Sequence, residues 1–109
     1  WYYLFYSGGL CCSQPCTYAT GVARSRDLLG PYAKSPAGPL LVSGARWLCP
    51  GGGSILDRGR AGAPLLFFQA YARGDPARAR QVLVAAIRFD AAGWPYVPGR
   101  VAPARVRAR

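Results

Sequence analysis

The sequence predicts an all-β fold, and two observations support this prediction. Short runs of aromatic and β-branched residues recur along the chain, and Gly, Pro and Asp separate them, which is the pattern of strands joined by turns. Only residues 76–81 have a helical composition, and Gly74 with Pro76 favours a loop there. Strands at this spacing are typical of a sandwich, a barrel or the blades of a propeller.

The first third of the chain predicts two strands. Residues 1–7 are apolar on both alternate faces, whereas a strand with one solvated face would alternate apolar and polar residues. We therefore expect this first strand to be covered on both sides. Residues 20–25 are the second strand, which ends at Asp27 and the Gly30-Pro31 turn, and a connection rich in Pro and Gly follows over residues 35–44.

The remainder of the chain predicts a hairpin and two further strands. Residues 54–57 and 64–71 form the hairpin. Residues 82–89 are the next strand, and residues 90–93 turn into a last short strand over residues 94–96.

Composition limits the classes of function. The 109 residues allow one small domain, and they carry a formal charge of +10 with no His. The Arg residues are scattered from Arg24 to Arg109 and do not interleave with aromatic residues, so a nucleic-acid partner is not favoured. No stretch approaches the roughly 20 apolar residues that cross a bilayer, which predicts no membrane partner.

The chain is expected to be a fragment with one domain and a tail. It contains no Met, and Trp1 stands directly inside the first strand-like run. Residues 1–97 hold all the predicted strands. Residues 98–109 are rich in Arg, Pro and Ala and are expected to form a basic tail.

Four cysteines, Cys11, Cys12, Cys16 and Cys49, allow three kinds of site. An even count in a short chain favours disulfides and an oxidising compartment, although four cysteines can pair in three ways. A zinc site is a second reading, but the usual C-x2-C spacing is absent. Buried free thiols are the third reading.

Four motifs in a fixed order carry a family resemblance. They are WYYLFYSGG at residues 1–9, GVARSRDLLGPY at 21–32, CPGGGSILD at 49–57 and RQVLVAAIRFDAAGWP at 80–95. Together they resemble the C-terminal third of a glycoside hydrolase family 43 catalytic domain, from Trp1 to about Val97. That family contains arabinanases, arabinofuranosidases and xylosidases.

The resemblance implies a fold, a reaction and a location. The fold is a five-bladed β-propeller, of which this chain would be the last blades, with the active site on the central axis. The reaction is inverting hydrolysis of a glycosidic bond in arabinose- or xylose-containing carbohydrate, for which the family uses an Asp base, a Glu acid and a second Asp. The parent protein is expected to be extracellular or periplasmic.

None of the three catalytic carboxylates is expected in this chain. It has no Glu, and its four acidic residues, Asp27, Asp57, Asp75 and Asp90, all stand in turn contexts where Asp bonds to nearby backbone N–H groups. The carboxylates therefore belong to upstream blades. The expected partners are the carbohydrate substrate and those missing N-terminal blades of the same chain.

The resemblance carries over three substrate positions. Arg80 matches an Arg that bonds the sugar, although a solvated Arg in the charged run that ends there is the alternative. Gln69 stands where the family has a YHAY-like strand, so it replaces an imidazole with a group that cannot titrate. Trp47 is a candidate for the rim of the pocket.

A metal or cofactor is not expected. The family's PGHGS motif places an axial His that helps to hold a metal or a water, and here Gly52 stands at that position. A calcium ion is therefore disfavoured. The missing imidazoles at Gly52 and Gln69 also support an alternative function, a non-catalytic carbohydrate-binding propeller. A basic nucleic-acid-binding β domain is a further alternative.

Overall fold

The computed structural model describes residues 1–13, 15–75 and 79–105, and this part of the chain is all-β, as predicted. Its only helical element is one 3₁₀ turn, η1 (Gly59–Ala61), which lies between β4 and β5. The strands are β1 (Tyr2–Gly8), β2 (Ala19–Ser25), β3 (Ala33–Lys34), β4 (Trp47–Leu56), β5 (Leu65–Ala72), β6 (Arg80–Ala86), β7 (Arg88–Phe89), β8 (Pro95–Tyr96) and β9 (Ala102–Pro103).

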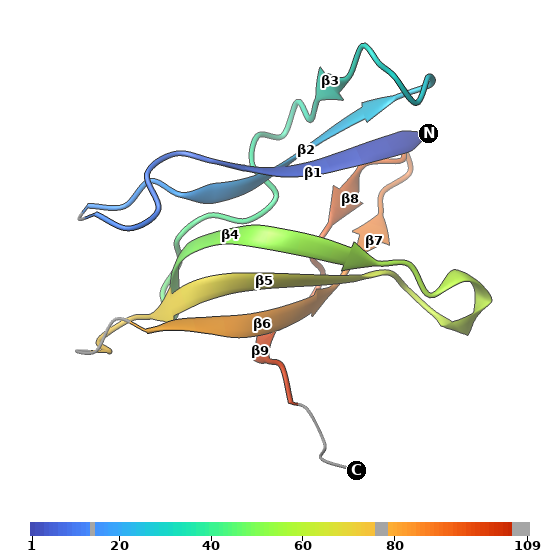
Figure 1. Ribbon diagram of the computed structural model, residues 1–109. Coiled ribbons are helices and arrows are strands. Elements are labelled where there is room, and N and C mark those ends of the chain that lie inside the picture. The colour runs from blue at the N-terminus through green and yellow to red at the C-terminus, as the bar shows by residue number, and fades with distance from the viewer. Residues whose placement is uncertain (14, 76–78, 106–109) are drawn as a thin grey trace.

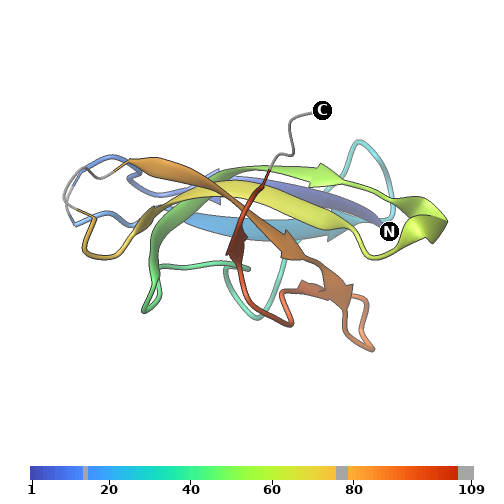
Figure 2. The same cartoon turned by 90° about the horizontal axis from the view of Figure 1, so that it is seen from below.

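The strands form three antiparallel sheets, ordered β1-β2-β3, β4-β5-β6-β9 and β7-β8. Figure 1 shows the two larger sheets one above the other, with β7 and β8 beside them near the N-terminus. Figure 2 shows that the end of β1, the end of β5 and the start of β6 lie at the same end of the molecule. The candidate site lies at this end.

The core lies on one face of the second sheet. Leu66, Phe68 and Ala70 of β5 alternate inward and are at most 2% exposed. Phe68 is paired with Leu83 of β6, so both side chains lie on this same face. Partly buried residues from the connections before β4 and after β8 cover it. Burying one Leu contributes about 1.5–3 kcal/mol, so this cluster stabilises the β5–β6 hairpin.

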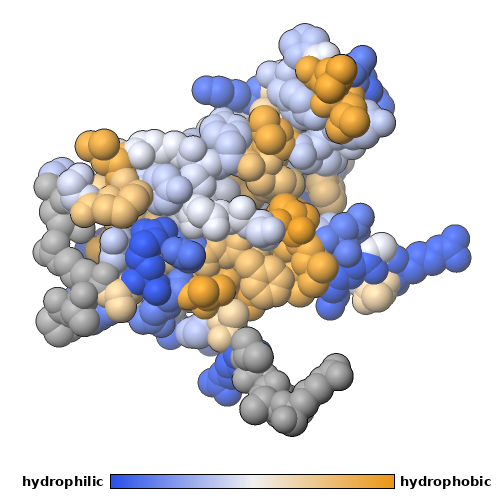
Figure 3. Space-filling model, viewed as in Figure 1, coloured by the Kyte–Doolittle hydropathy of each residue, from blue (hydrophilic) through white to orange (hydrophobic). Residues whose placement is uncertain are grey.

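The opposite face of the same sheet is largely open. Tyr71 is paired with Arg80, and Gln69 with Val82, so these four side chains share the face away from the core. Val82 is 50% exposed. In Figure 3, apolar surface gathers over β4, β5 and β6 in this view. Polar groups and open apolar surface therefore lie on one face.

Strand β4 is longer than predicted. The sequence predicted a strand over residues 54–57, but β4 begins at Trp47 and passes through all three consecutive glycines. The pairing of β4 with β5 shifts between Leu48 and Gly51, and again between Gly51 and Ser54. These bulges allow the strand to continue through Gly-rich sequence that alone favours a loop.

The predicted strand over residues 82–89 is divided in the structure. β6 ends at Ala86, and the N–H of Ile87 donates to the carbonyl of Pro64. β7 then leaves the second sheet and pairs with β8. The predicted turn over residues 90–93 joins these two strands, because the N–H of Gly93 donates to the carbonyl of Asp90.

Strand β1 is not covered on both sides within the described residues, contrary to the prediction. Tyr2 and Leu4, which alternate onto one face, are each 48% exposed. Tyr3 and Phe5 on the other face are half-buried. On the first of these faces only Tyr6 is half-buried, so the face is covered at one end alone.

Two predicted segments, the loop over residues 76–81 and the C-terminal tail, lie partly outside the described residues. The predicted loop over residues 76–81 falls partly outside the described residues, because residues 76–78 are not described. In the expected tail, Ala102 and Pro103 form β9 and pair with Val84 and Leu83 of β6. The division at residue 97 stays a prediction.

Candidate active site

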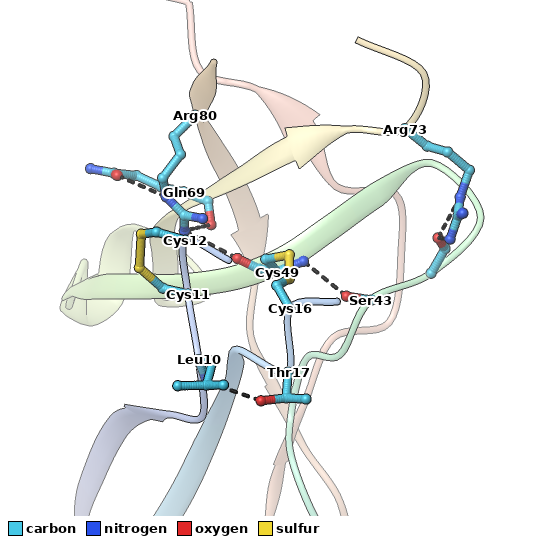
Figure 4. Close-up of a disulfide and its surroundings, with 11 residues drawn as sticks. Leu10, Cys11, Cys12, Cys16, Thr17, Ser43, Cys49, Gln69, Arg73 and Arg80 are labelled. Carbon is cyan, nitrogen blue, oxygen red and sulfur yellow. Dashed lines mark hydrogen bonds between the residues drawn. A yellow bond between two sulfur atoms is a disulfide. The ribbon is translucent and has the colours of Figure 1, made fainter. Parts of the chain in front are cut away.

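Arg80 and Gln69 are brought together at the end of the β5–β6 hairpin. Arg80 opens β6, and Gln69 is two residues from Tyr71, the residue with which Arg80 is paired. The Nε of Arg80 donates to Oε1 of Gln69 at 3.3 Å, and Nη2 donates to the backbone carbonyl of Gln69 at 2.8 Å. Figure 4 shows the two side chains in contact.

Three further residues complete the surroundings of the guanidinium. Nη2 of Arg80 also donates to the carbonyl of Cys49 at 3.1 Å. The guanidinium carbon lies 5.5 Å from the ring centre of Tyr18 and 5.0 Å from that of Tyr71. Such cation–π contacts stabilise by about 0.5–2 kcal/mol each. We call these five residues, Arg80, Gln69, Cys49, Tyr18 and Tyr71, the Arg80 cluster.

One donor of the cluster is left over. Nη1 of Arg80 is buried and makes no hydrogen bond to any described residue. A guanidinium nitrogen that is buried without an acceptor costs free energy. A hydroxyl or carboxylate oxygen would satisfy it.

Cys49 has an uncommon backbone. Its φ is +61°, and it is the only described residue other than glycine with a positive φ. This left-handed conformation costs a non-glycine residue about 1–2 kcal/mol. Cys49 is completely buried, its N–H donates to Oγ of Ser43 at 2.9 Å, and its sulfur is bonded to that of Cys16. Surrounding contacts therefore hold the conformation in place.

All four cysteines are in disulfides. Cys16 pairs with Cys49, which joins the β1–β2 loop to the start of β4, and Cys11 pairs with its neighbour Cys12 in the same loop (Figure 4). The disulfide interpretation fits these pairs, which leave no thiolate for a zinc ion and no free thiol.

The glycines after Cys49 bring β4 close to its neighbours. A Cβ on Gly51 would lie 2.1 Å from a ring carbon of Tyr18, so only Gly leaves room for this member of the Arg80 cluster. The N–H of Gly52 donates to Oγ of Ser7 at 2.9 Å. The N–H of Gly52 is therefore already used, and as a glycine it supplies no side-chain ligand.

The residues present do not fit a calcium ion. Calcium takes six to eight oxygen ligands, carboxylates above all. Within residues 1–13, 15–75 and 79–105, no three His, Cys, Asp or Glu side chains gather in a group that could hold a metal.

Trp47 is separated from the Arg80 cluster. Trp47 is paired with Ala72, whereas Arg80 is paired with Tyr71, and successive residues of β5 face opposite sides of the sheet. Trp47 packs against the core and lines a separate cavity of about 300 Å³ beside Leu41 and Arg100. The structure does not bring together all three predicted substrate residues.

The acidic side chains serve turns. The side chain of Asp27 accepts the N–H of Leu29, that of Asp57 accepts the N–H of Gly59, and that of Asp90 accepts the N–H of Trp94. Asp75 accepts the N–H of Ala79. These are the backbone contacts that the turn contexts predicted.

Sequence reasoning missed Tyr18 and Cys49 as partners of Arg80. Tyr18 lies outside the four motifs, and Cys49 is predicted only as a disulfide candidate. Their positions beside the Cys-rich loop and the glycine run were the available signal in the sequence, but such positions do not indicate where a side chain or a carbonyl points.

Within the described residues there is no helix long and apolar enough to span a membrane.

Two comparisons identify relatives of the chain. Residues 1–95 match the family model of the glycosyl hydrolases family 43. The extracellular exo-alpha-(1->5)-L-arabinofuranosidase ArbA of Cellvibrio japonicus (strain Ueda107) is 33% identical over 106 residues, which cover 89% of this chain and 30% of that protein. The chain thus spans about 30% of the length of this relative. With a family match over most of its length, the chain belongs to glycosyl hydrolase family 43.

Proposed function

We propose that this chain is the C-terminal part of a five-bladed β-propeller in a glycosidase that acts on arabinose-containing carbohydrate by inversion. The family match over residues 1–95 carries the proposal. The name of the relative from Cellvibrio japonicus makes α-(1→5)-linked arabinofuranosides the first substrate class to test. Its extracellular location, together with two disulfides here, supports an extracellular or periplasmic parent protein.

The catalytic carboxylates would come from outside this chain. Inverting hydrolysis needs one carboxylic acid at the leaving oxygen and one carboxylate that activates water on the opposite face of the sugar. The four Asp side chains here accept backbone N–H groups in turns. The open face of β1 and the open face of β5–β6 offer apolar surface on which the other blades of the same protein would pack.

Arg80 would bind the sugar. Its Nε and Nη2 donate within the Arg80 cluster, which fixes the direction of the guanidinium, and Nη1 has no acceptor among the described residues. Oε1 of Gln69 accepts the hydrogen bond from Nε of Arg80, and Gln69 lies on the same open face of the sheet as Arg80. The cluster would thus orient the substrate, and the carboxylates would carry out the proton transfers.

The test uses the complete protein with α-(1→5)-linked arabinotriose. We expect hydrolysis with inversion. Proton NMR spectra recorded before mutarotation should show that the released sugar first forms as the anomer opposite to that of the substrate. Arg80→Ala should raise KM at least about tenfold, which corresponds to loss of one strong hydrogen bond. Arg60→Ala, an exposed change in η1, is the matched control. An unchanged KM in Arg80→Ala would refute the substrate contact.

The 109-residue polypeptide on its own should not hydrolyse an arabinofuranoside, because no acid and base pair is present. Release of nitrophenol from nitrophenyl arabinofuranoside by this polypeptide would contradict the proposed origin of the carboxylates.

A non-catalytic carbohydrate-binding propeller is the second candidate. Gly52 and Gln69 stand where the family has imidazoles, and this observation favours it. Calorimetry separates the two functions: binding of arabinotriose by the complete protein, without any turnover over days, would support the binder over the enzyme.

A further inference from the structure

The backbone of Cys49 is directed at Arg80 by a bulge. Leu48 is paired with Tyr71 and Gly51 with Gln69, so Cys49 and Pro50 stand opposite the single residue Ala70. A bulge of this kind turns backbone groups out of the ladder. The freed carbonyl of Cys49 accepts the hydrogen bond from Nη2 of Arg80.

The left-handed conformation of Cys49 is what gives this carbonyl its direction. The conformation is disfavoured for any residue with a Cβ, so it persists only where other contacts impose it. One contact is the hydrogen bond from the N–H of Cys49 to Ser43. The segment that contains Ser43 is fixed by two hydrogen bonds of its neighbour Gly44. The N–H of Gly44 donates to the carbonyl of Trp47, and the carbonyl of Gly44 accepts from Nη2 of Arg73. The second contact is the disulfide with Cys16.

The disulfide is not needed to close the β1–β2 loop. The N–H groups of Thr17 and Tyr18 both donate to the carbonyl of Leu10 at 3.0 Å, and the N–H of Leu10 donates to Oγ1 of Thr17. The ends of the loop are therefore joined by hydrogen bonds. The bond from Cys16 therefore serves to fix the position of Cys49.

We propose that Cys49 is a positioning residue for Arg80, and that its bond to Cys16 holds it in the left-handed conformation that points its carbonyl at the guanidinium. This inference rests on the proposed role of Arg80 in substrate binding. It assigns the Cys16–Cys49 disulfide a part in substrate affinity as well as in stability.

The experiment compares two variants of the complete protein that both lack the disulfide. Cys16→Ser/Cys49→Gly places a residue that adopts positive φ freely, and Cys16→Ser/Cys49→Ala places one that does not. KM for arabinotriose should rise about tenfold in the Ala variant and stay within about threefold of the parent in the Gly variant, with kcat similar in both. The control Cys11→Ser/Cys12→Ser removes the other disulfide and should leave KM unchanged.

Two further measurements make the result decisive. In an Arg80→Ala background the difference between the Gly and Ala variants should vanish, as in a double-mutant cycle. The Nη2–H resonances of Arg80, identified by their loss in Arg80→Ala, should be protected from exchange in the Gly variant and exposed in the Ala variant, because Nη2 donates to the Cys49 carbonyl. This measurement requires no substrate.

The outcomes separate the inference from the proposed function. If Arg80→Ala leaves KM unchanged, the substrate contact fails, and the exchange of the Nη2–H protons alone decides the positioning role. If Arg80→Ala raises KM but the Gly and Ala variants behave alike in KM and in exchange, the positioning role of Cys49 is wrong.

Discussion

At the scale of single residues, the Arg80 cluster depends on the absence of a side chain at Gly51. Gly51→Ala should lower the free energy of unfolding by about 1–3 kcal/mol, because the added methyl group overlaps the Tyr18 ring and must displace it. Displacement of Tyr18 also removes one ring from the Arg80 guanidinium. Denaturation of the complete protein in guanidinium chloride measures the first effect.

Gly8→Ala is the matched control for this prediction. Gly8 ends β1, has no neighbour within 4 Å of an added Cβ, and should change stability by less than about 0.5 kcal/mol. Equal effects of the two substitutions would show that Tyr18 does not require the space above Gly51.

Single residues also show where sequence reasoning stops. Arg80 and Gln69 were identified by their motifs, and the structure places them in contact. Trp47 was grouped with them, but a side chain's face depends on strand register, and pairing with Ala72 places Trp47 on the core face of the sheet. The partnership of Arg80 with a backbone carbonyl could not be predicted, because no side-chain type encodes it.

At the scale of elements, an aromatic clamp joins β2 to the turn between β7 and β8. The guanidinium carbon of Arg24 lies 4.1 Å from the ring centre of Trp1 and 3.9 Å from that of Trp94. Nη1 of Arg24 donates to the carbonyl of Ala92 at 2.6 Å. Tyr3 adds a hydrogen bond from its hydroxyl to the carbonyl of Gly93. The first and third sheets are thus held together by polar and stacking contacts.

Because of this clamp, we expect Arg24→Ala and Arg24→Lys to lower the stability of the protein by different amounts. The Ala variant should lose about 1.5–3.5 kcal/mol of stability, the sum of two exposed cation–π contacts and one hydrogen bond. The Lys variant should lose less, because it keeps the charge but not the planar stacking. Thermal melts, with the exposed Arg88→Ala as the control, measure the series. Identical melting temperatures for all three variants would rule out the clamp.

The predicted elements were right where local pattern and tertiary structure agree. β2 and β5 follow their apolar pattern closely, since both pack within the described chain. β4 was predicted too short because Gly favours loops locally, whereas pairing with β5 extends the strand through bulges. The end of β6 was missed because residues 82–89 are uniformly strand-like, and only the change of partner divides them, from β5 up to Ala86 to β8 from Arg88.

At the scale of the whole molecule, open apolar surface should make the isolated 109-residue polypeptide self-associate. Leu56 and Val82 are 49% and 50% exposed, and strand β1 is an open sheet edge. Replacing both residues with polar ones, Leu56→Gln and Val82→Thr, should lower the oligomer fraction in sedimentation velocity runs. Leu29→Gln is the control, because Leu29 is 93% exposed in the turn after β2. A monomeric parent polypeptide that binds no apolar dye would contradict the prediction.

The Cys16–Cys49 bond also changes the topology of the chain. It closes a covalent ring with a sequence separation of 33 residues, and this ring contains all of β2, β3 and the connection rich in Pro and Gly. In the loop-entropy model, a ring of this size raises the free energy of the unfolded state by about 3–4 kcal/mol, because it reduces the conformational entropy of the unfolded chain. A protease that cuts once inside the ring opens it but releases no piece, so both halves of the molecule stay covalently attached until a reductant separates them.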